Sequence, residues 1–261
     1  MTVLEAFAPL ALAADWDAVG LQVGDPTRPC ARIGIGLDVI ASTLEEALTA
    51  NVDLIVSHHP LFLRPTKSIR FDQPQGHLIQ QLCTHQVSVY AMHTNLDATR
   101  GGLNDFLADQ IGLKNRRSLL PAPQGLPQEF EGAGLGRIGE LKTPETLHAL
   151  ATRLQTRFQS QALRIIGKRQ RELRSLALCT GSGGSLVHNA ITSGVDGYIT
   201  GDVKYHQALD AEAAGLAIID IGHYASEIVC LEILSKVLRD GFGNSISIIP
   251  LTRAQDPLQA L

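Results

Sequence analysis

The sequence predicts an α/β fold made of two similar domains, in each of which helices pack on a mostly parallel sheet. Short apolar runs rich in β-branched residues alternate with helix-forming segments along the 261 residues, an order typical of parallel sheets covered by helices. A segment of the first half also aligns to a segment of the second half. With 44% hydrophobic and 18% charged residues, the chain has the composition of a globular protein with a sizeable core.

The first half contains an N-terminal helix and three later pairs of strand and helix. The opening "MTVLEAFAPLALAADWD" has no basic start and carries Glu5 within its apolar stretch, which predicts an amphipathic helix rather than a signal peptide. Each later strand is a run of Ile, Val and Leu, and each helix has apolar residues at helical spacing. In order, we expect a strand at 32–39, a helix at 42–51, a strand at 52–59, a helix at 76–86, a strand at 87–93 and a helix at 101–113.

The second half repeats this alternation after an interruption. Residues 119–136, rich in Pro and Gly, are the candidate linker between domains. Residues 164–174 hold five basic side chains in eleven positions and predict a solvated hairpin or turn. We then expect a strand at 173–181, a helix at 185–194, a strand at 196–202, a helix at 205–215, a strand at 216–222 and a long helix at 225–241.

An internal repeat relates the two halves. Residues 33–53 align without a gap to residues 176–196, with five of 21 positions identical, including the final Val-Asp pairs. Beyond the next helix and strand, "HTNLD" (93–97) and "HYASE" (223–227) each place a histidine four residues before a carboxylate. Shared α/β patterning is the alternative explanation of this match.

Charge and cysteine usage exclude several classes of protein. The net charge of −4 gives no general reason to bind nucleic acid or an anionic membrane. The four cysteines are far apart and form no CxxC pair, which argues against a zinc ribbon or redox motif and for a reducing compartment. No apolar run approaches the roughly 20 residues of a membrane span. We therefore expect a cytoplasmic protein without a membrane partner, and nucleic acid as an unlikely one.

Histidines and carboxylates gather where the predicted strands end. Parallel strands bring their carboxyl ends to one edge of a sheet, where ligands commonly bind. Imidazoles and carboxylates without thiolate suit Zn²⁺, Fe²⁺ or Mn²⁺. The alternative is that these histidines cap strands or bind one another in a polar cleft. The residues concerned are His58, His59, His93, Asp97, His223 and Glu227.

Five motifs together resemble a known family. They are "WDAVGLQVGD" (16–25), "SHHPLF" (57–62), "HTNLD" (93–97), "TGDVKYHQALDA" (200–211) and "GHYASE" (222–227). In this order they resemble the GTP cyclohydrolase 1 type 2 family, also called the Nif-three-like dinuclear metal-centre proteins. The match covers essentially the whole chain, without an extra domain between its halves.

The resemblance implies two divalent ions per subunit, in a cleft between two α/β domains. It implies a discontinuous first domain of residues 1–115 and 212–261, a second domain of residues 116–211, and a homo-oligomer, usually a hexamer. His93 is not a ligand in the family, so we expect it to orient a carboxylate or to donate a proton. The ligands that the resemblance implies are His58, His59, Asp97, His223 and Glu227.

Several other positions have two interpretations. His206 is the candidate general acid or base, and a structural hydrogen bond is its alternative. Asp202 is either a residue of the site or the N-cap of a helix. The loop "TGSGGS" (180–185) either holds a phosphate, with Lys204 nearby, or forms a tight turn. Trp16 and Asp17 line the cleft mouth or, for the tryptophan, simply pack.

The activity that the family name implies is hydrolysis of GTP, in which hydroxide attacks the purine ring and formate is lost. One alternative is a metal-dependent phosphohydrolase of a nucleotide or phosphoester, which the same ligands would serve. The other is a non-enzymatic metal-binding or regulatory protein. An open water position at the metal would favour an enzyme, and a closed site would favour binding.

Overall fold

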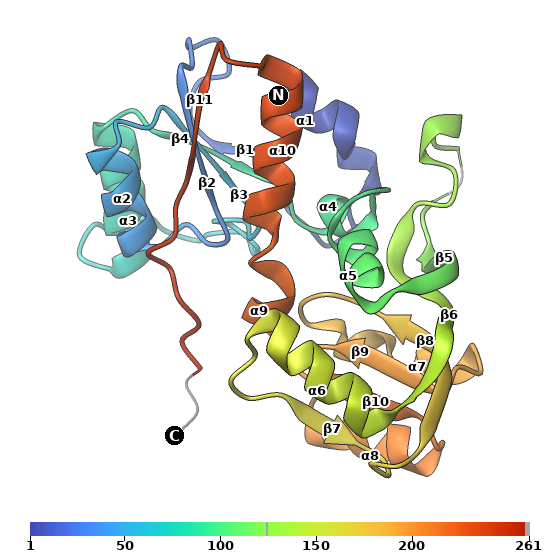
Figure 1. Ribbon diagram of the computed structural model, residues 1–261. Coiled ribbons are helices and arrows are strands. Elements are labelled where there is room, and N and C mark those ends of the chain that lie inside the picture. The colour runs from blue at the N-terminus through green and yellow to red at the C-terminus, as the bar shows by residue number, and fades with distance from the viewer. Residues whose placement is uncertain (124, 259–261) are drawn as a thin grey trace. The chain divides into compact units, whose positions relative to one another are not determined.

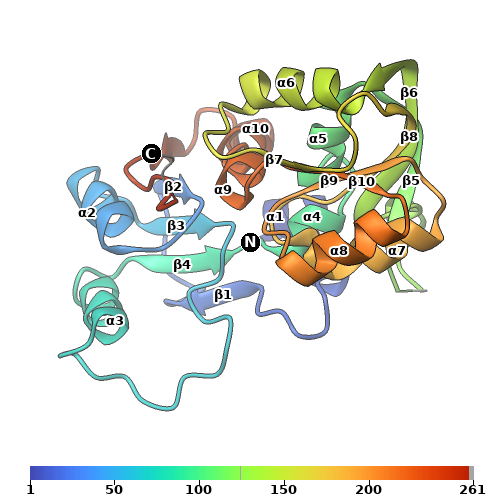
Figure 2. The same cartoon turned by 90° about the horizontal axis from the view of Figure 1, so that it is seen from below.

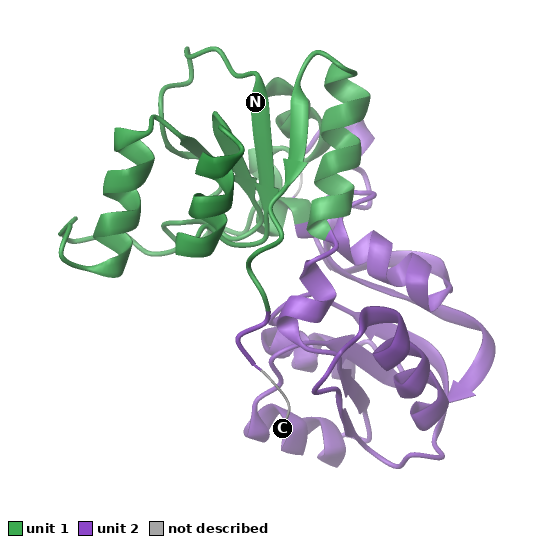
Figure 3. Ribbon diagram, turned by 60° about the vertical axis from the view of Figure 1, so that its left-hand side comes forward, with its two compact units in different colours: residues 1–96, 230–255 green, residues 97–229, 256–261 purple. Residues whose placement is uncertain are grey.

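Two β-sheets, each covered by helices, organise the chain (Figures 1 and 2). The computed structural model describes residues 1–123 and 125–258. Contacts divide the chain into two units, which Figure 3 shows in different colours. Unit 1 holds residues 1–96 and 230–255, and unit 2 holds residues 97–229 with a short piece of the tail from Asp256. The predicted α/β class is confirmed.

Unit 1 contains a five-stranded sheet in the order β1-β4-β3-β2-β11. The pairings β11–β2, β2–β3 and β3–β4 are parallel, and β1 runs antiparallel to β4 at the edge. Its elements are α1 (Thr2–Phe7), η1 (Leu10–Leu12), β1 (Gly20–Val23), β2 (Arg32–Gly36), α2 (Ala41–Thr49), β3 (Leu54–Ser57), α3 (Pro74–Thr84), β4 (Ser88–Ala91), α10 (Cys230–Phe242) and β11 (Ser247–Pro250). The short helix α4 (Thr94–Ala98) contains the boundary to unit 2.

The sheet of unit 1 is covered on both faces. Figure 2 shows α2 and α3 on one face and α1 and α10 on the other. On the α2–α3 side, Leu44, Ile55 and Leu82 belong to one buried cluster. Strands buried on both faces are continuous apolar runs, which is why β2 and β3 were recognisable in the sequence.

Unit 2 contains a six-stranded mixed sheet in the order β5-β6-β8-β9-β10-β7. Only β8–β9 and β9–β10 pair in parallel, and the pairings of β5, β6 and β7 are antiparallel. The expectation of a mostly parallel sheet in each domain is therefore wrong for unit 2, because β5, β6 and β7 do not follow the alternation of strand and crossover helix that parallel pairing requires. Its elements are α5 (Leu103–Ile111), β5 (Leu113–Pro121), η2 (Gln128–Phe130), β6 (Gly134–Thr146), α6 (Leu147–Phe158), β7 (Arg164–Ile166), β8 (Glu172–Leu178), η3 (Gly183–Leu186), α7 (Val187–Thr192), β9 (Gly197–Thr200), α8 (Tyr205–Ala213), β10 (Ala217–Asp220) and α9 (His223–Glu227).

Alternate residues of the unit 2 strands serve two cores. On β9, Ile199 joins the cluster that contains α5 and α6, whereas Tyr198 joins the cluster that contains α7 and α8. On β10, Ile219 and Ile218 divide in the same way. Successive side chains of a strand point to opposite faces, so both faces of this sheet are buried.

Some predicted boundaries differ from the structure. The chain enters unit 2 at residue 97 and leaves it at 229, whereas the sequence placed these crossings at 116 and 211. The segment 119–136 is not a linker between domains, because β5 and β6 on either side of its turn pair within unit 2. The predicted helix 225–241 is broken into α9 and α10.

The basic segment 164–174 forms a turn but not a hairpin. Its first strand, β7, pairs with β10 rather than with β8, so the turn joins two strands that are not neighbours. Within the described residues, no helix is long and apolar enough to cross a membrane.

The internal repeat has a structural counterpart. Asp53 accepts hydrogen bonds at Oδ2 from the backbone N–H groups of residues 31 and 32, both at 2.9 Å. Asp196 accepts the aligned pair, from the N–H groups of residues 174 and 175, also at 2.9 Å. Each aspartate therefore stabilises the preceding strand of its own unit, at the start of β2 in unit 1 and within β8 in unit 2.

We expect Asp53→Ala and Asp196→Ala to destabilise the protein by similar amounts, about 1–3 kcal/mol each, because each leaves two backbone donors without their acceptor. Burial raises the pKa of Asp196, but the hydrogen bonds from Ser175 and Arg174 outweigh it and lower the pKa. Its contribution is therefore present above the unfolded-state pKa and lost as the pH falls through the folded one. Urea unfolding measures both variants. Asp240→Ala, which removes an exposed ion pair with Lys236, is the control and should change little.

Candidate metal centre

Three histidines gather at the carboxyl ends of β3 and β4 in unit 1. His58 and His59 follow directly after β3, and His93 follows β4 by one residue. The ring centroids of His58 and His59 are 5.1 Å apart, and those of His58 and His93 are 5.2 Å apart. One ring nitrogen of each of the three lies within 4.8 Å of the others, so this cluster could hold a metal ion. The expectation that these two strand ends meet is confirmed.

Each of these rings is held at Nδ1 by an oxygen. His58 Nδ1 lies 2.8 Å from the Met92 carbonyl oxygen, and His59 Nδ1 lies 2.7 Å from Asp38 Oδ1. His93 Nδ1 lies 2.8 Å from Asp17 Oδ1. A carbonyl or carboxylate oxygen only accepts hydrogen bonds, so Nδ1 carries the proton. A neutral ring then has its lone pair at Nε2, which is the arrangement that metal-binding histidines have.

Asp17 connects the N-terminal segment to this cluster. Its side chain is fully buried and also accepts hydrogen bonds from the Thr94 N–H at 3.0 Å and from the Thr94 hydroxyl. Burial raises its pKa, but the hydrogen bonds from His93 and Thr94 outweigh burial and lower the pKa to about 2. Asp17 is therefore a carboxylate at neutral pH and fixes the orientation of His93.

Trp16 does not pack in the core. Its side chain is 63% exposed, and its ring lies edge-on to His93 with centroids 6.1 Å apart. Of the two interpretations, a simple packing role for this tryptophan is wrong. An exposed aromatic ring beside His93 forms part of the surface around the histidine cluster.

Unit 2 has a set of donors of its own, on α9. His223 begins this helix and Glu227 lies one turn later, which places His223 Nε2 at 2.8 Å from Glu227 Oε2. The Nδ1 atom of His223 lies 2.7 Å from Asp202 Oδ2. His223 thus repeats the arrangement of the unit 1 histidines, with a carboxylate at Nδ1 and the other nitrogen beside a second ligand.

Asp202 is not the N-cap of α8. The N-cap position is Lys204, and Asp202 lies two residues earlier with φ of 56°. The N-cap interpretation of Asp202 is therefore wrong, and the carboxylate orients His223 instead. Asp38, which does the same for His59, was missed in the sequence. Asp38 lies two residues beyond the end of β2, and β2 pairs in parallel with β3, which His59 follows. A search for polar residues just past the ends of neighbouring parallel strands would therefore have found it.

Asp97 and Glu227 are both buried carboxylates of unit 2, at 7% and 3% exposure. Asp97 Oδ1 accepts a hydrogen bond of 3.2 Å from the Thr180 hydroxyl. Burial raises the pKa of Cys179 far above its usual value, and the negative charges of Asp97 and Glu227 raise it further. Cys179 is therefore a neutral thiol, and the donors around it are carboxylates, as the sequence predicted for hard divalent ions.

The glycine-rich loop 180–185 packs around Glu227. A Cβ atom at Gly181 would lie 1.9 Å from Glu227 Oε1, and Gly181 has φ of +63°. The N–H groups of Thr180, Gly181 and Gly183 donate to Asn104, Ser226 and Thr200, respectively. Because these donors are already used, the loop favours the tight-turn interpretation over a phosphate site.

His206 belongs to α8 rather than to α9 or to the strand ends. It is exposed near the start of α8, next to the exposed Tyr205, with ring centroids 5.5 Å apart. Within the described chain, no hydrogen bond joins His206 to a ligand candidate. Its role as general acid or base stays a prediction.

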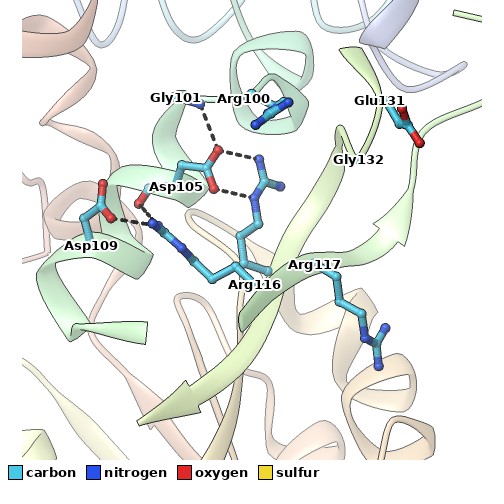
Figure 4. Close-up of a pocket in the computed structure, with 9 residues that line it drawn as sticks. Arg100, Gly101, Asp105, Asp109, Arg116, Arg117, Glu131 and Gly132 are labelled. Carbon is cyan, nitrogen blue, oxygen red and sulfur yellow. Dashed lines mark hydrogen bonds and ion pairs between the residues drawn. The ribbon is translucent and has the colours of Figure 1, made fainter. Parts of the chain in front are cut away.

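A cavity in unit 2 has a volume of about 750 Å³ and four arginines in its lining (Figure 4). The guanidinium of Arg137 is buried and donates to both oxygens of Asp105 and to the carbonyls of Thr99, Gly134 and Gly136. Arg116 pairs with Asp109 at 2.8 Å, and Arg117 points away from Asp105. Two of the four arginines are thus compensated by aspartates of the same lining, and the potential metal-ligand atoms of the described residues gather elsewhere, so the histidine and carboxylate sets are the stronger candidates.

The family model Duf34/NIF3 (NGG1p interacting factor 3) matches residues 1–257. A protein of Clostridium acetobutylicum named "GTP cyclohydrolase 1 type 2 homolog" is 34% identical over 236 residues, which cover 90% of this chain and 87% of the relative. One of the same name from Streptococcus pneumoniae serotype 4 is 33% identical over 260 residues, or 97% and 95% of the two chains.

Solved structures with the same fold include three bacterial and archaeal proteins. Staphylococcus aureus protein SA1388 has a TM-score of 0.89 at 28% identity, and the match covers 100% of this chain and 97% of the SA1388 chain. Reduced HcgD from Methanocaldococcus jannaschii has a TM-score of 0.81 at 28% identity, covering 96% and 95%. A Bacillus cereus protein related to NIF3 has a TM-score of 0.91 at 24% identity, covering 100% and 97%, and supports the fold alone.

We expect Asp17→Ala to destabilise the protein by about 3 kcal/mol, because it leaves buried donors of His93 and Thr94 without an acceptor. Since the folded-state pKa of Asp17 is lowered from 3.8 to about 2, the wild-type contribution is present above 3.8 and lost as the pH falls toward 2. Thermal unfolding between pH 2 and 7 measures this difference. The exposed Asp25, which also accepts from a backbone N–H, supplies the control Asp25→Ala. Equal losses in both variants would contradict the assigned role of Asp17.

A matched glycine pair tests the packing of the loop against Glu227. Gly181 and Gly194 both have positive φ, +63° and +72°, but a Cβ atom at Gly194 meets nothing within 4 Å. Both alanine variants should lose about 1 kcal/mol from backbone strain. Gly181→Ala should lose at least about 1–3 kcal/mol more, because the new methyl group displaces Glu227. Urea unfolding would refute this packing if the two variants were equally stable.

Proposed function

The chain belongs to the Duf34/NIF3 family, and from this membership we propose that it is a metal-dependent hydrolase of the GTP cyclohydrolase 1 type 2 kind. Two divalent ions, Zn²⁺, Fe²⁺ or Mn²⁺, are its cofactors, and a nucleotide such as GTP is its substrate. The ligands in this proposal are His58, His59, Asp97, His223 and Glu227.

The observation that carries the proposal is the hydrogen bonding of the histidine rings at Nδ1. In His58 and His59 an oxygen acceptor occupies Nδ1, which directs the lone pair of the neutral ring to Nε2. His223 has the Asp202 carboxylate at Nδ1 in the same way, and its Nε2 faces Glu227, the ligand with which it would share an ion. Two of these acceptors are the carboxylates of Asp38 and Asp202. A histidine that only caps a strand has no need of such an arrangement. The residues therefore fit divalent metal ions.

The carboxylate ligands add negative charge to these neutral imidazoles. Asp97 and Glu227 are buried, and burying a carboxylate is costly unless a cation or hydrogen bonds compensate it. A divalent ion supplies that compensation. When bound, such ions polarise a substrate and lower the pKa of water toward neutrality.

His93 is suited to move a proton in this reaction. Its Nδ1 is fixed by Asp17, so the ring can accept a proton at Nε2 and pass it on while the buried carboxylate balances the charge. Opening a purine ring and releasing formate needs protons on the departing nitrogens, which His93 would deliver. We retain His206 as a second proton carrier that could act once a substrate is bound.

The assembly and location of the protein remain predictions. We expect a homo-oligomer, a hexamer as the family resemblance implies, in the cytoplasm. The donor set would also serve a phosphohydrolase, so the products formed from a nucleotide decide between these two enzyme classes.

The test combines metal content with product analysis. Protein purified without chelators should carry two divalent ions per chain by elemental analysis, and Asp97→Ala and His223→Ala should lose most of this metal while keeping their secondary structure. His188→Ala, which removes an exposed histidine of α7, should keep it. Incubated with GTP, the metal-loaded protein should release formate. Release of phosphate would instead identify a phosphohydrolase, and absence of turnover with Zn²⁺, Fe²⁺ and Mn²⁺ would reject the enzymatic proposal.

A further inference from the structure

A cavity in unit 1 has the candidate metal ligand His59 in its lining. The cavity has a volume of about 620 Å³, lies between α2 and α3, and is also lined by Asp38. Sites for small molecules commonly have about 300–1,000 Å³ and apolar walls with a few polar groups. The apolar part of this lining is formed mainly by Val39, Ile40, Leu44, Leu48, Leu61 and Leu78.

The charge of the lining limits what this cavity can bind. It contains the carboxylates of Asp38 and Glu45 but neither a lysine nor an arginine. Glu45 pairs with Arg253 at 3.4 Å and is largely exposed, whereas Asp38 lies beside His59. An anionic group such as a phosphate would therefore be repelled from the Asp38 end, and a neutral group that donates hydrogen bonds would be attracted.

Asp38 retains acceptor capacity. Its Oδ1 atom binds His59 Nδ1 at 2.7 Å, and its side chain is 37% exposed. Within the described residues, Oδ2 has no hydrogen-bond partner. A hydrocarbon chain placed here would cover this oxygen without compensating it, which costs free energy. A flat ring with N–H groups on one edge would fill the apolar space and donate to Oδ2.

We propose that the α2–α3 cavity binds the base of a purine nucleoside, with the N–H donors of a guanine-type edge directed at Asp38. This inference rests on the proposed function and specifies its substrate, because the cavity takes the ring and leaves the phosphates outside. His59 belongs both to the lining and to the ligand set, so the ring is held beside the metal ligands. Asp38 then has two roles, orienting His59 through Oδ1 and recognising the base through Oδ2.

Binding of nucleosides to metal-free protein tests this inference without any turnover. Guanosine should bind in calorimetry, and inosine, which lacks the exocyclic amino group, should bind about tenfold more weakly, because a charged acceptor loses one donor. In Asp38→Asn the ratio of the guanosine and inosine affinities should fall from about ten toward one. Absence of guanosine binding at millimolar concentration, or tighter binding of decanoate than of guanosine, would overturn the proposal.

Two wall variants locate the site. Leu78→Glu places a charge in the apolar wall, and Ala41→Trp adds bulk at an exposed lining residue with little risk to folding. Both should weaken guanosine binding at least about tenfold, since each removes or blocks the apolar contact area of the ring. Leu209→Glu, a change at an exposed leucine of α8, is the matched control. Equal guanosine affinity in the wall variants and the control would place the base elsewhere.

The outcome is separable from that of the proposed function. Guanosine binding that depends on Leu78 and Ala41, without formate release from GTP, would support the cavity and reject the cyclohydrolase. Formate release from GTP with unchanged KM in the two wall variants would support the cyclohydrolase and overturn the cavity assignment.

Discussion

The candidate site depends on one kind of interaction, a hydrogen bond from a histidine Nδ1 to an oxygen acceptor. It sets the orientation of His58, His59, His93 and His223, and the tautomer of the three histidines of unit 1. Without these acceptors each ring could rotate and present either nitrogen, and no defined ligand geometry would follow. The acceptors also explain polar residues near the strand ends that have no other evident role.

Parallel strand pairing supplies three of these four acceptors, and Asp17 comes instead from the segment before β1. Asp38 follows β2 and binds His59 after β3, and the Met92 carbonyl follows β4 and binds His58 after β3. In unit 2, Asp202 follows β9 and binds His223 beyond β10. Neighbouring parallel strands end side by side, so a residue just past one strand reaches a residue just past the next. The sheet therefore positions both the imidazole and the group that orients it.

The repeat within the sequence was informative but needed correction in detail. The pair Asp53 and Asp196 makes the same two backbone hydrogen bonds, as the alignment requires. The strands that follow are also equivalent, because Met92 and Ile221 each donate to the end of the preceding strand. If Met92 corresponds to Ile221, then the residue that corresponds to His223, two positions later, is Thr94 and not His93. The motifs "HTNLD" and "HYASE" are therefore shifted by one residue, and similar letters occupy different structural positions.

The sequence alone determined the α/β class and most helices and strands, because apolar runs and helical periodicity are local properties of the chain. The ends of the predicted strands then pointed to the histidines and carboxylates that follow them. Tertiary structure decided which oxygen holds each ring: Asp38, Asp17 and Asp202 lie 21, 76 and 21 residues from their histidines. It also decided that the glycines at 181 and 183 serve close packing and that β6 pairs with β8. Contacts between distant segments depend on strand order and register, which a single sequence does not specify.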